Sequence, residues 1–201
     1  MFSDALDDFK LVLASASPRR RQLMEEAGFR FTSATIDYEE TWPSGLTGRQ
    51  IAEFLAAGKA DSYKTDLGSD TVLITADTVV WCRETYLGKP ADKSEAVHFL
   101  NILSGCEHEV ITGICLRNRE RKHTFSVSTT VTFRELKEEE IRYYVDNFSP
   151  LDKAGAYGIQ DWIGLRGITR INGSYYNVVG MPVSELYNEL LAFTGNKTTM
   201  I

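Results

Sequence analysis

The chain has 201 residues, of which 43% are hydrophobic and 25% are charged. This length corresponds to about one domain, and the composition is that of an ordinary folded protein, which excludes disordered and collagen-like chains. We therefore expect a single domain over residues 1–201, with a core at about 10–193. Lys and Arg number 22 against 28 Asp and Glu, for a formal charge of -6, so we expect no nucleic-acid partner.

The sequence shows no signal for a membrane or for export. No run approaches ~18 consecutive apolar residues, and residues 1–10 hold several aspartates and no apolar stretch. We expect a soluble cytoplasmic protein without membrane contact. Cys82, Cys106 and Cys115 are an odd number without Cys-x-x-Cys spacing, so they predict buried thiols rather than a disulfide framework or a zinc site.

The first third of the chain alternates strands with helices. The predicted elements are, in order, a strand at Lys10–Ala14, a helix from Pro18 that ends at Gly28, a strand at 29–35, a loop over 36–48 and a helix over 49–63. Ser17 is the expected cap of the first helix, because its hydroxyl can accept a hydrogen bond from a free backbone N–H of the first turn.

Hairpins are predicted in the middle of the chain. The expected elements are a buried strand at 71–76, a second apolar run at 79–82, a turn at 83–85, a helix capped by Ser94, two antiparallel strands at 107–116 and 124–133, a helix at 137–146, an irregular glycine-rich stretch over 155–173 and a helix at 183–193. This order predicts an α/β fold with an elongated mixed β-sheet flanked by helices.

The turn from Ser15 to Arg20 is a candidate anion site. A strand that leads directly into a helix exposes backbone N–H groups, and phosphate is their natural ligand. Arg19, Arg20 and Arg21 lie in the first helical turn, where the helix dipole disfavours cations unless an anion is also bound. A solvated basic helix end is the alternative.

Asp77 follows the apolar run 72–76, and ligands of open α/β sheets commonly bind where such strands end. Its carboxylate can bind Mg²⁺ or accept a proton from water, and either role suits phosphate chemistry. The alternative is an aspartate that hydrogen-bonds to the backbone of its own turn.

Other polar residues have both a functional and a structural interpretation. Glu39 and Glu40 lie in a polar loop, and Lys59 and Lys89 can either balance phosphate charge or extend into solvent. In the segment 152–160, Gln160 offers a donor and an acceptor to one edge of a nucleobase. The three histidines, at 98, 108 and 123, show no metal-ligand spacing and are interpreted as structural.

Seven short motifs together resemble the Maf family of nucleotide pyrophosphatases, in particular its dTTP/UTP branch. In family order they are LASASPRR (13–20), ADTVV (76–80), GKP (88–90), LSG (103–105), DKAGAYGIQ (152–160), INGS (171–174) and NVVGMP (177–182). The resemblance covers nearly the whole chain. It implies a Maf/ITPase-like fold with a central cleft between two lobes.

The resemblance also implies a reaction and roles for individual residues. Its activity is hydrolysis of dTTP and UTP to the nucleoside monophosphate and pyrophosphate with Mg²⁺ or Mn²⁺, and its members form homodimers. The proton acceptor falls on Asp77, and the acidic loop position falls on Glu40, with Asp37 and Glu39 as alternatives; Asp77 and Glu40 are the predicted metal ligands. Residues that select a pyrimidine fall on Arg19, Thr78 and Gln160, and phosphate and active-site contacts fall on Ser15, Arg20, Lys59 and Lys89.

Two other functions stay open at this point. One is hydrolysis of 7-methyl-GTP or of modified purine triphosphates, although Arg19 and Gln160 stand where the 7-methyl-GTP branch tends to have an aromatic residue and an acid. The other is a non-enzymatic nucleotide-binding protein that regulates cell division. Binding without metal-dependent turnover would distinguish this regulator from an enzyme.

Overall fold

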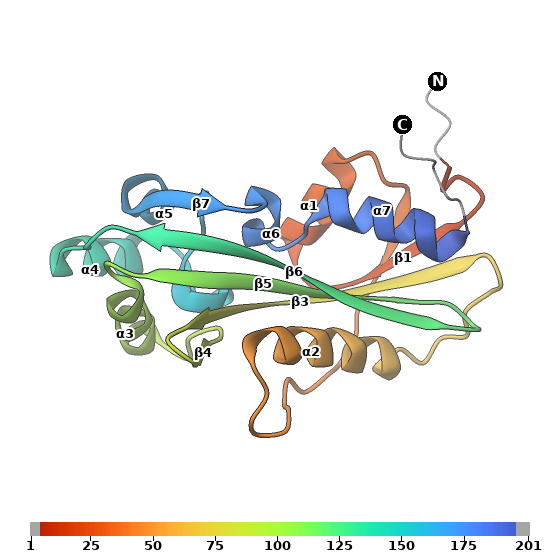
Figure 1. Cartoon of the computed structure of the whole chain (residues 1–201), viewed down its shortest axis with the longest axis horizontal. Helices are drawn as coiled ribbons and strands as arrows, with labels where there is room; N and C mark the ends of the chain where they lie inside the picture. The colour runs from red at the N-terminus through yellow and green to blue at the C-terminus, as the bar shows by residue number, and fades with distance from the viewer. Residues whose placement is uncertain (1–4, 196–201) are drawn as a thin grey trace.

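A computed structural model describes residues 5–195 of the chain (Figure 1). The expectation for residues 1–10 therefore lies partly outside the described residues. The strands are β1 (Lys10–Ala14), β2 (Phe31–Ala34), β3 (Thr71–Cys82), β4 (Thr85–Leu87), β5 (Glu107–Arg117), β6 (Lys122–Phe133) and β7 (Ile168–Asn172). The helices are α1 (Pro18–Glu26), α2 (Gly48–Ser62), α3 (Lys93–Leu103), α4 (Glu138–Asn147), α5 (Trp162–Gly167), α6 (Tyr175–Val179) and α7 (Val183–Thr194), with two short 3-10 turns, η1 (Pro150–Asp152) and η2 (Ala154–Ala156).

The strands form one mixed sheet in the order β2-β1-β3-β5-β6-β7, and β4 pairs with the far end of β3. The strands β2, β1 and β3 are parallel to one another, whereas β3, β5, β6 and β7 pair antiparallel. The predicted mixed sheet with flanking helices is therefore confirmed. Figure 1 shows α2 on one face of the sheet and α1, α6 and α7 on the other.

Two hydrophobic clusters occupy the two ends of the long sheet. One contains Leu100 of α3 and Tyr144 of α4, and the other contains Met24 of α1 and Leu190 of α7. The strands β3, β5 and β6 run through both ends (Figure 1). A cleft between two lobes was predicted, and the separation of the two cores agrees with this prediction.

Gly113 of β5 allows α2 to lie close to the sheet. A Cβ atom at this position would collide with the backbone carbonyl of Ala52 in α2. Since any larger residue would push the helix outward, Gly113 fixes the distance at which α2 presents Lys59 to the sheet.

The structure corrects the prediction that a strand ends at Ala76. β3 continues without interruption from Thr71 to Cys82, and Asp77 lies in its middle, paired with Gly113 of β5. On the other side of β3, β1 pairs only as far as Ile74, and β4 begins to pair at Val80. Asp77 therefore lies within β3 rather than at its end. One edge of the strand is paired with β5 at this point, whereas the other edge has no partner strand among the described residues between the end of β1 and the start of β4.

Three other element predictions were wrong in detail. Asp92, not Ser94, caps α3, because its carboxylate accepts a hydrogen bond from the Glu95 N–H at 2.8 Å. The predicted strand at 29–35 is shorter, at Phe31–Ala34. The glycine-rich stretch predicted as irregular, 155–173, contains α5 and β7, because its glycines provide bends between short elements rather than a continuous loop.

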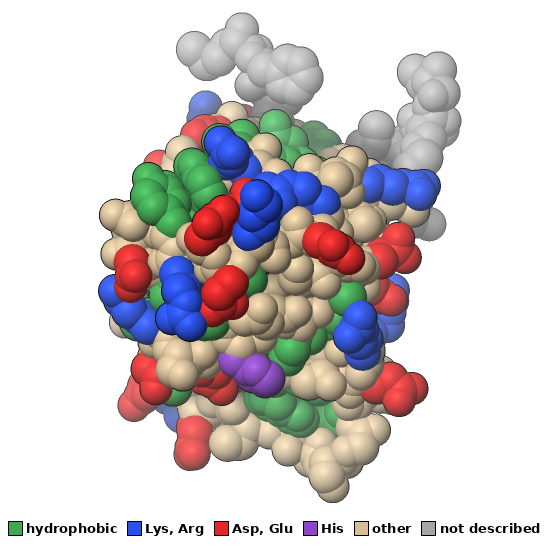
Figure 2. Space-filling view, turned by 90° about the vertical axis from the view of Figure 1, so that its left-hand side faces the viewer, with side chains coloured by type: hydrophobic (Ala, Val, Ile, Leu, Met, Phe, Trp, Pro, Cys, Tyr) green, Lys and Arg blue, Asp and Glu red, His purple; other side chains and the backbone are tan. Residues whose placement is uncertain are grey.

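The described part of the chain contains no helix that is both long and apolar enough to cross a bilayer. All three cysteines are buried free thiols, as predicted. Figure 2 shows the end of the molecule that carries α3, α4 and α5, where acidic and basic side chains are interspersed. No large area of one charge is visible on that face.

Candidate functional site

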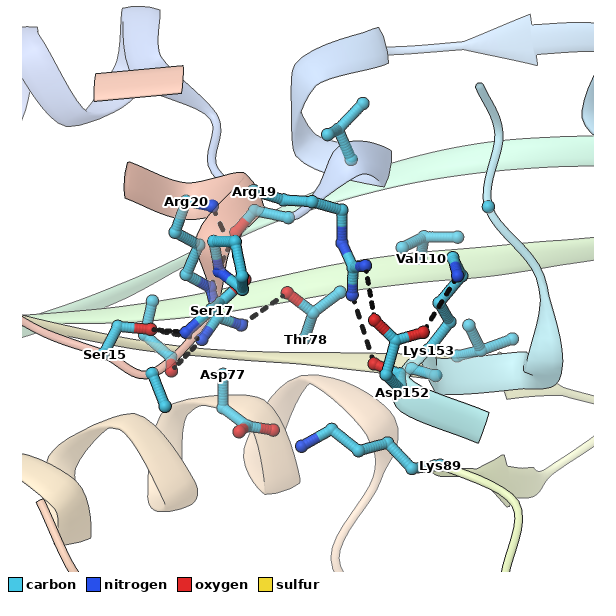
Figure 3. Close-up of a pocket in the computed structure, with 18 of the residues that line it drawn as sticks. Ser15, Ser17, Arg19, Arg20, Asp77, Thr78, Lys89, Val110, Asp152 and Lys153 are labelled. Carbon is cyan, nitrogen blue, oxygen red and sulfur yellow. Dashed lines mark hydrogen bonds and ion pairs between the residues drawn. The ribbon is translucent and has the colours of Figure 1, made fainter. Parts of the chain in front are cut away.

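A cavity of about 360 Å³ lies between the two lobes. Its lining comes from the β1–α1 turn, the middle of β3, α2, the loop after β4 and the segment that contains η1 and η2 (Figure 3). All nine predicted site residues line it, namely Ser15, Arg19, Arg20, Glu40, Lys59, Asp77, Thr78, Lys89 and Gln160. The fold thus brings these residues from distant parts of the sequence to one place.

Lys59 joins the two predicted acidic residues at the floor of the cavity. Its ammonium contacts the Asp77 carboxylate and donates a hydrogen bond to Glu40 Oε1 at 2.8 Å. Lys89 Nζ lies 3.9 Å from the same Glu40 oxygen. Of the three loop carboxylates considered, Glu40 lines the cavity, whereas Asp37 and Glu39 do not.

The pKa values of the two carboxylates shift in opposite directions. Burial raises the pKa of Asp77 above its ordinary value, although the charges of Lys59 and Arg20 oppose this change. Burial also acts to raise the pKa of Glu40, but the hydrogen bond and charge of Lys59 outweigh it and lower this pKa overall. Glu40 therefore stays ionised, while Asp77 takes up a proton more readily than an ordinary aspartate.

Arg20 fills the gap between β1 and β4. Its guanidinium donates to the backbone carbonyls of Gly180 and Ala76, both at 2.9 Å, and to Thr78 Oγ1 at 3.0 Å. It also donates to Ser15 Oγ at 3.4 Å. Because a guanidinium has five N–H bonds, one N–H, on Nη2, is left for a ligand. Arg20 therefore acts mainly by holding the cavity in shape, and it offers a ligand only one hydrogen-bond donor.

The start of α1 is built as predicted. Ser17 accepts a hydrogen bond from the Arg20 N–H at 3.5 Å, and Pro18 occupies the first helical position. The Ser15 hydroxyl accepts a hydrogen bond from the Ser17 N–H at 3.2 Å. This turn leads from β1 directly into α1, and it lies along one wall of the cavity (Figure 3).

Arg19 is neutralised by a residue that we did not predict as its partner. It donates to the Asp152 carboxylate at 2.8 Å and to the Asp152 backbone carbonyl at 3.1 Å. Lys153 donates to the other carboxylate oxygen of Asp152 at 2.8 Å. Sequence reasoning gave no signal for the Arg19–Asp152 pair because 133 positions separate the two residues.

Aliphatic side chains line the other end of the cavity. They are Val80, Val110, Ala154, Val178 and Val179, which all belong to or pack against one hydrophobic cluster, and Gln160 also lines the cavity. Gly155 allows η2 to pack against the sheet there, because a Cβ atom at this position would lie 2.9 Å from Val80 Cγ2. The apolar surface and the Gln160 amide together suit a flat ring with polar edges.

Tyr157 turns its polar end away from this ring-sized space. Its hydroxyl lies 2.8 Å from His108 Nε2, and its ring packs against Phe133. The interpretation of His108 as structural agrees with this burial. Two further tyrosines, Tyr38 and Tyr86, line the cavity and were missed, and burial raises the pKa of each, so both keep their protons at neutral pH.

The cavity concentrates positive charge in an acidic protein. Five cationic side chains line it against three carboxylates, namely Arg19, Arg20, Lys59, Lys89 and Lys153 against Glu40, Asp77 and Asp152. No cluster of three or more His, Cys, Asp or Glu residues that could hold a metal ion occurs within residues 5–195. The arrangement therefore suits an anion at its basic end, with two carboxylates available to a hard cation that the anion also binds.

Comparisons with known proteins agree with the resemblance seen in the motifs. The family model described as Maf-like protein matches residues 10–193. A protein of Bacteroides fragilis named dTTP/UTP pyrophosphatase is 48% identical over 186 residues, which cover 92% of this chain and 96% of that protein. A protein of the same name from Parabacteroides distasonis is 46% identical, and the alignment covers 94% of this chain and 98% of that protein. Another, from Flavobacterium psychrophilum, is 42% identical, and the alignment covers 96% of this chain and 100% of that protein.

Among solved structures, the Staphylococcus aureus Ham1 protein aligns with a TM-score of 0.49 and 14% identity, over 94% of this chain and 100% of its own. The family assignment does not depend on that alignment. It follows from the match over residues 10–193 and from relatives above 40% identity along nearly their whole length. The chain belongs to the Maf family.

Proposed function

We propose that this protein hydrolyses dTTP and UTP to the nucleoside monophosphate and pyrophosphate. The observation that carries the proposal is a buried carboxylate, Asp77, in contact with Lys59 inside a cavity that five cations line. Relatives named dTTP/UTP pyrophosphatase at 42–48% identity support it.

The triphosphate fits the basic end of the cavity. Lys89 is 59% exposed at its side chain, so its ammonium is available to phosphate oxygens. The N-terminal turn of α1 and the remaining N–H of Arg20 add directional donors. Several cations are needed because three phosphates repel an approaching nucleophile unless their charge is compensated.

Asp77 and Glu40 fit a divalent cation. Their carboxylates converge on one ammonium in this structure, and Mg²⁺ or Mn²⁺ prefers oxygen ligands, commonly one or two carboxylates together with substrate phosphates. When bound, the cation would compensate phosphate charge and polarise the phosphoryl group. Lys59 already supplies part of this charge from the protein side.

Asp77 is the proposed proton acceptor. It lies 6% exposed in the middle of β3, and burial raises its pKa toward the value at which a carboxylate is an effective general base. In the proposed reaction, Asp77 removes a proton from a water molecule that attacks the α phosphorus, and pyrophosphate leaves. Lys59 holds the Asp77 carboxylate in place through their contact.

The base fits the aliphatic end. Val80 and Val110 provide a surface for a flat ring, and Gln160 offers hydrogen bonds to its edge. Arg19 and Thr78 also line the cavity, and we propose that Arg19, Thr78 and Gln160 together select the pyrimidine. A single-domain organisation, a homodimer and a cytoplasmic location stay predictions.

A product assay tests the proposal and separates it from the alternatives. The purified protein is incubated with Mn²⁺ and dTTP, UTP, CTP, 7-methyl-GTP or inosine triphosphate, and products are resolved by chromatography. Thymidine monophosphate and pyrophosphate as the preferred products support the proposal. Unchanged dTTP would support a regulator without turnover, and preference for a modified purine would support the other alternative.

A further inference from the structure

A row of hydrogen-bonding groups leads from the cavity into the core. Thr78 lines the cavity, and its Oγ1 lies 3.0 Å from Oγ1 of Thr112 on the neighbouring strand β5. Thr112 is fully buried and does not line the cavity. Its hydroxyl donates to the backbone carbonyl of Asn177, in α6, at 3.2 Å.

Asn177 is held so that its carbonyl stays in place. The side-chain amide donates to the Val110 carbonyl at 2.9 Å and to Thr129 Oγ1 at 3.0 Å. Its backbone N–H donates to Ser174 Oγ at 3.2 Å, and the residue is completely buried. A carbonyl oxygen only accepts hydrogen bonds, so it determines which way the neighbouring hydroxyl points.

Counting protons then fixes the orientation of Thr78. A threonine has one O–H, and that of Thr112 is used on the Asn177 carbonyl. The contact between the two hydroxyls therefore needs the proton of Thr78. Arg20 Nη2 donates to Thr78 Oγ1 at 3.0 Å and occupies one of its lone pairs (Figure 3). Thr78 presents to the cavity one lone pair and no proton.

We propose that Thr112 is a positioning residue that makes Thr78 a pure hydrogen-bond acceptor, so that Thr78 selects a substrate group that donates an N–H or O–H. This inference rests on the proposed function. Phosphate oxygens are acceptors and are disfavoured beside the lone pair, which places Thr78 next to the nucleoside part. In dTTP the available donors are the imide N3–H of the base and the 3′-hydroxyl of the sugar.

Two analogues distinguish these donors in the unmodified protein. In dCTP the ring N3 is an acceptor, and in 3′-deoxy-3′-fluorothymidine triphosphate fluorine replaces the 3′-hydroxyl. Dissociation constants are measured by calorimetry in EDTA, so that nothing is hydrolysed. The analogue that lacks the donor facing Thr78 is expected to bind about tenfold more weakly than dTTP, because the half-buried Thr78 acceptor loses its partner. If both analogues bind within twofold of dTTP, the proposal is overturned.

The Thr112→Val variant tests the positioning role. Valine keeps the shape but cannot accept the Thr78 proton, so the Thr78 hydroxyl becomes free to turn and donate into the cavity. The preference for dTTP over the discriminating analogue is expected to fall below about threefold, and Thr112→Ser is expected to restore it. Loss of stability alone would not change this ratio.

Thr75→Val is the matched control. Thr75 is a buried threonine of β3 whose hydroxyl donates to the Ala56 carbonyl of α2 at 2.7 Å rather than to Thr78. Its substitution therefore removes one buried hydrogen bond but leaves the preference unchanged. An unchanged preference in Thr112→Val contradicts the inference while leaving the proposed function intact. If the protein neither binds a nucleotide nor hydrolyses one with Mn²⁺, both the proposed function and the inference about Thr112 fail. If Thr112→Val does not fold, the affinities of the unmodified protein for dTTP and the two analogues still test whether Thr78 acts as an acceptor.

Discussion

The Arg20 guanidinium donates a hydrogen bond to the Ala76 carbonyl, 2.9 Å away, where β3 has no strand partner on that side. The Arg20 side chain thus supplies the hydrogen bond that a neighbouring strand would otherwise give to β3. It also donates hydrogen bonds to Ser15 and Thr78 at the cavity. The strand and the site depend on each other through this residue.

Replacement of Arg20 by Lys should therefore damage both stability and activity. An ammonium cannot reproduce the planar fork, so at least one buried carbonyl loses its donor, and the free energy of unfolding should fall by about 2 kcal/mol. Turnover of dTTP should fall more than about tenfold. Arg21→Lys, on the exposed side of α1, is the control. Urea unfolding that shows equal stability for the two variants would contradict this role.

The contact of Lys59 with Asp77 and Glu40 predicts competition with metal ions. Because this ammonium balances the two carboxylates, Lys59→Met should strengthen Mn²⁺ binding to the nucleotide-free protein by about tenfold. Loss of the free Mn²⁺ signal in electron paramagnetic resonance measures this binding. Lys122→Met, which removes an ammonium beside Asp61 on the surface, should leave it unchanged. Equal affinities in wild type and Lys59→Met would argue against a cation position between the carboxylates.

Buried His108 predicts a loss of stability in acid. Burial lowers the pKa of His108 from 6.5 to about 4, so the folded protein keeps it neutral while the unfolded chain takes up a proton as pH falls below 6.5. This residue should therefore lower the free energy of unfolding by about 2 kcal/mol between pH 7 and pH 5, and its stabilising effect is fully present only above pH 6.5. His108→Gln should remove this part of the pH dependence, as measured by urea unfolding. The variant His123→Gln, at an exposed histidine, should keep the pH dependence of the wild type. If the free energy of unfolding of His108→Gln falls with pH as much as that of the wild type, His108 does not cause the loss of stability in acid.

Much of the site was predictable because its residues lie in local patterns. Ser17 and Pro18 form a helix start that is visible in the sequence, and the apolar run 72–76 predicts the buried strand that leads to Asp77. Charge and position alone left Lys59 and Lys89 ambiguous, and the resemblance to the Maf family assigned them to the site; both line the cavity. These signals depend on neighbours in the chain, so the sequence contains them.

The remaining features depend on contacts between distant segments. In the sequence, Asp77 and Thr78 look like a break between two apolar runs. In the structure β3 continues through them, because both residues pair with residues of β5. The pair of Arg19 with Asp152 and the support of Thr78 by Thr112 join residues 133 and 34 positions apart. Neither is visible before the sheet is assembled, since no periodicity links such positions.

The Asp77→Asn variant tests the central claim most directly. Asparagine keeps the size of the side chain but cannot accept a proton from water, so kcat for dTTP should fall at least about 100-fold. Binding of dTTP in EDTA should persist, and Asp61→Asn, an exposed carboxylate on α2, should retain full activity. Turnover by Asp77→Asn at the wild-type rate would contradict the account, because another group would then have to remove the proton.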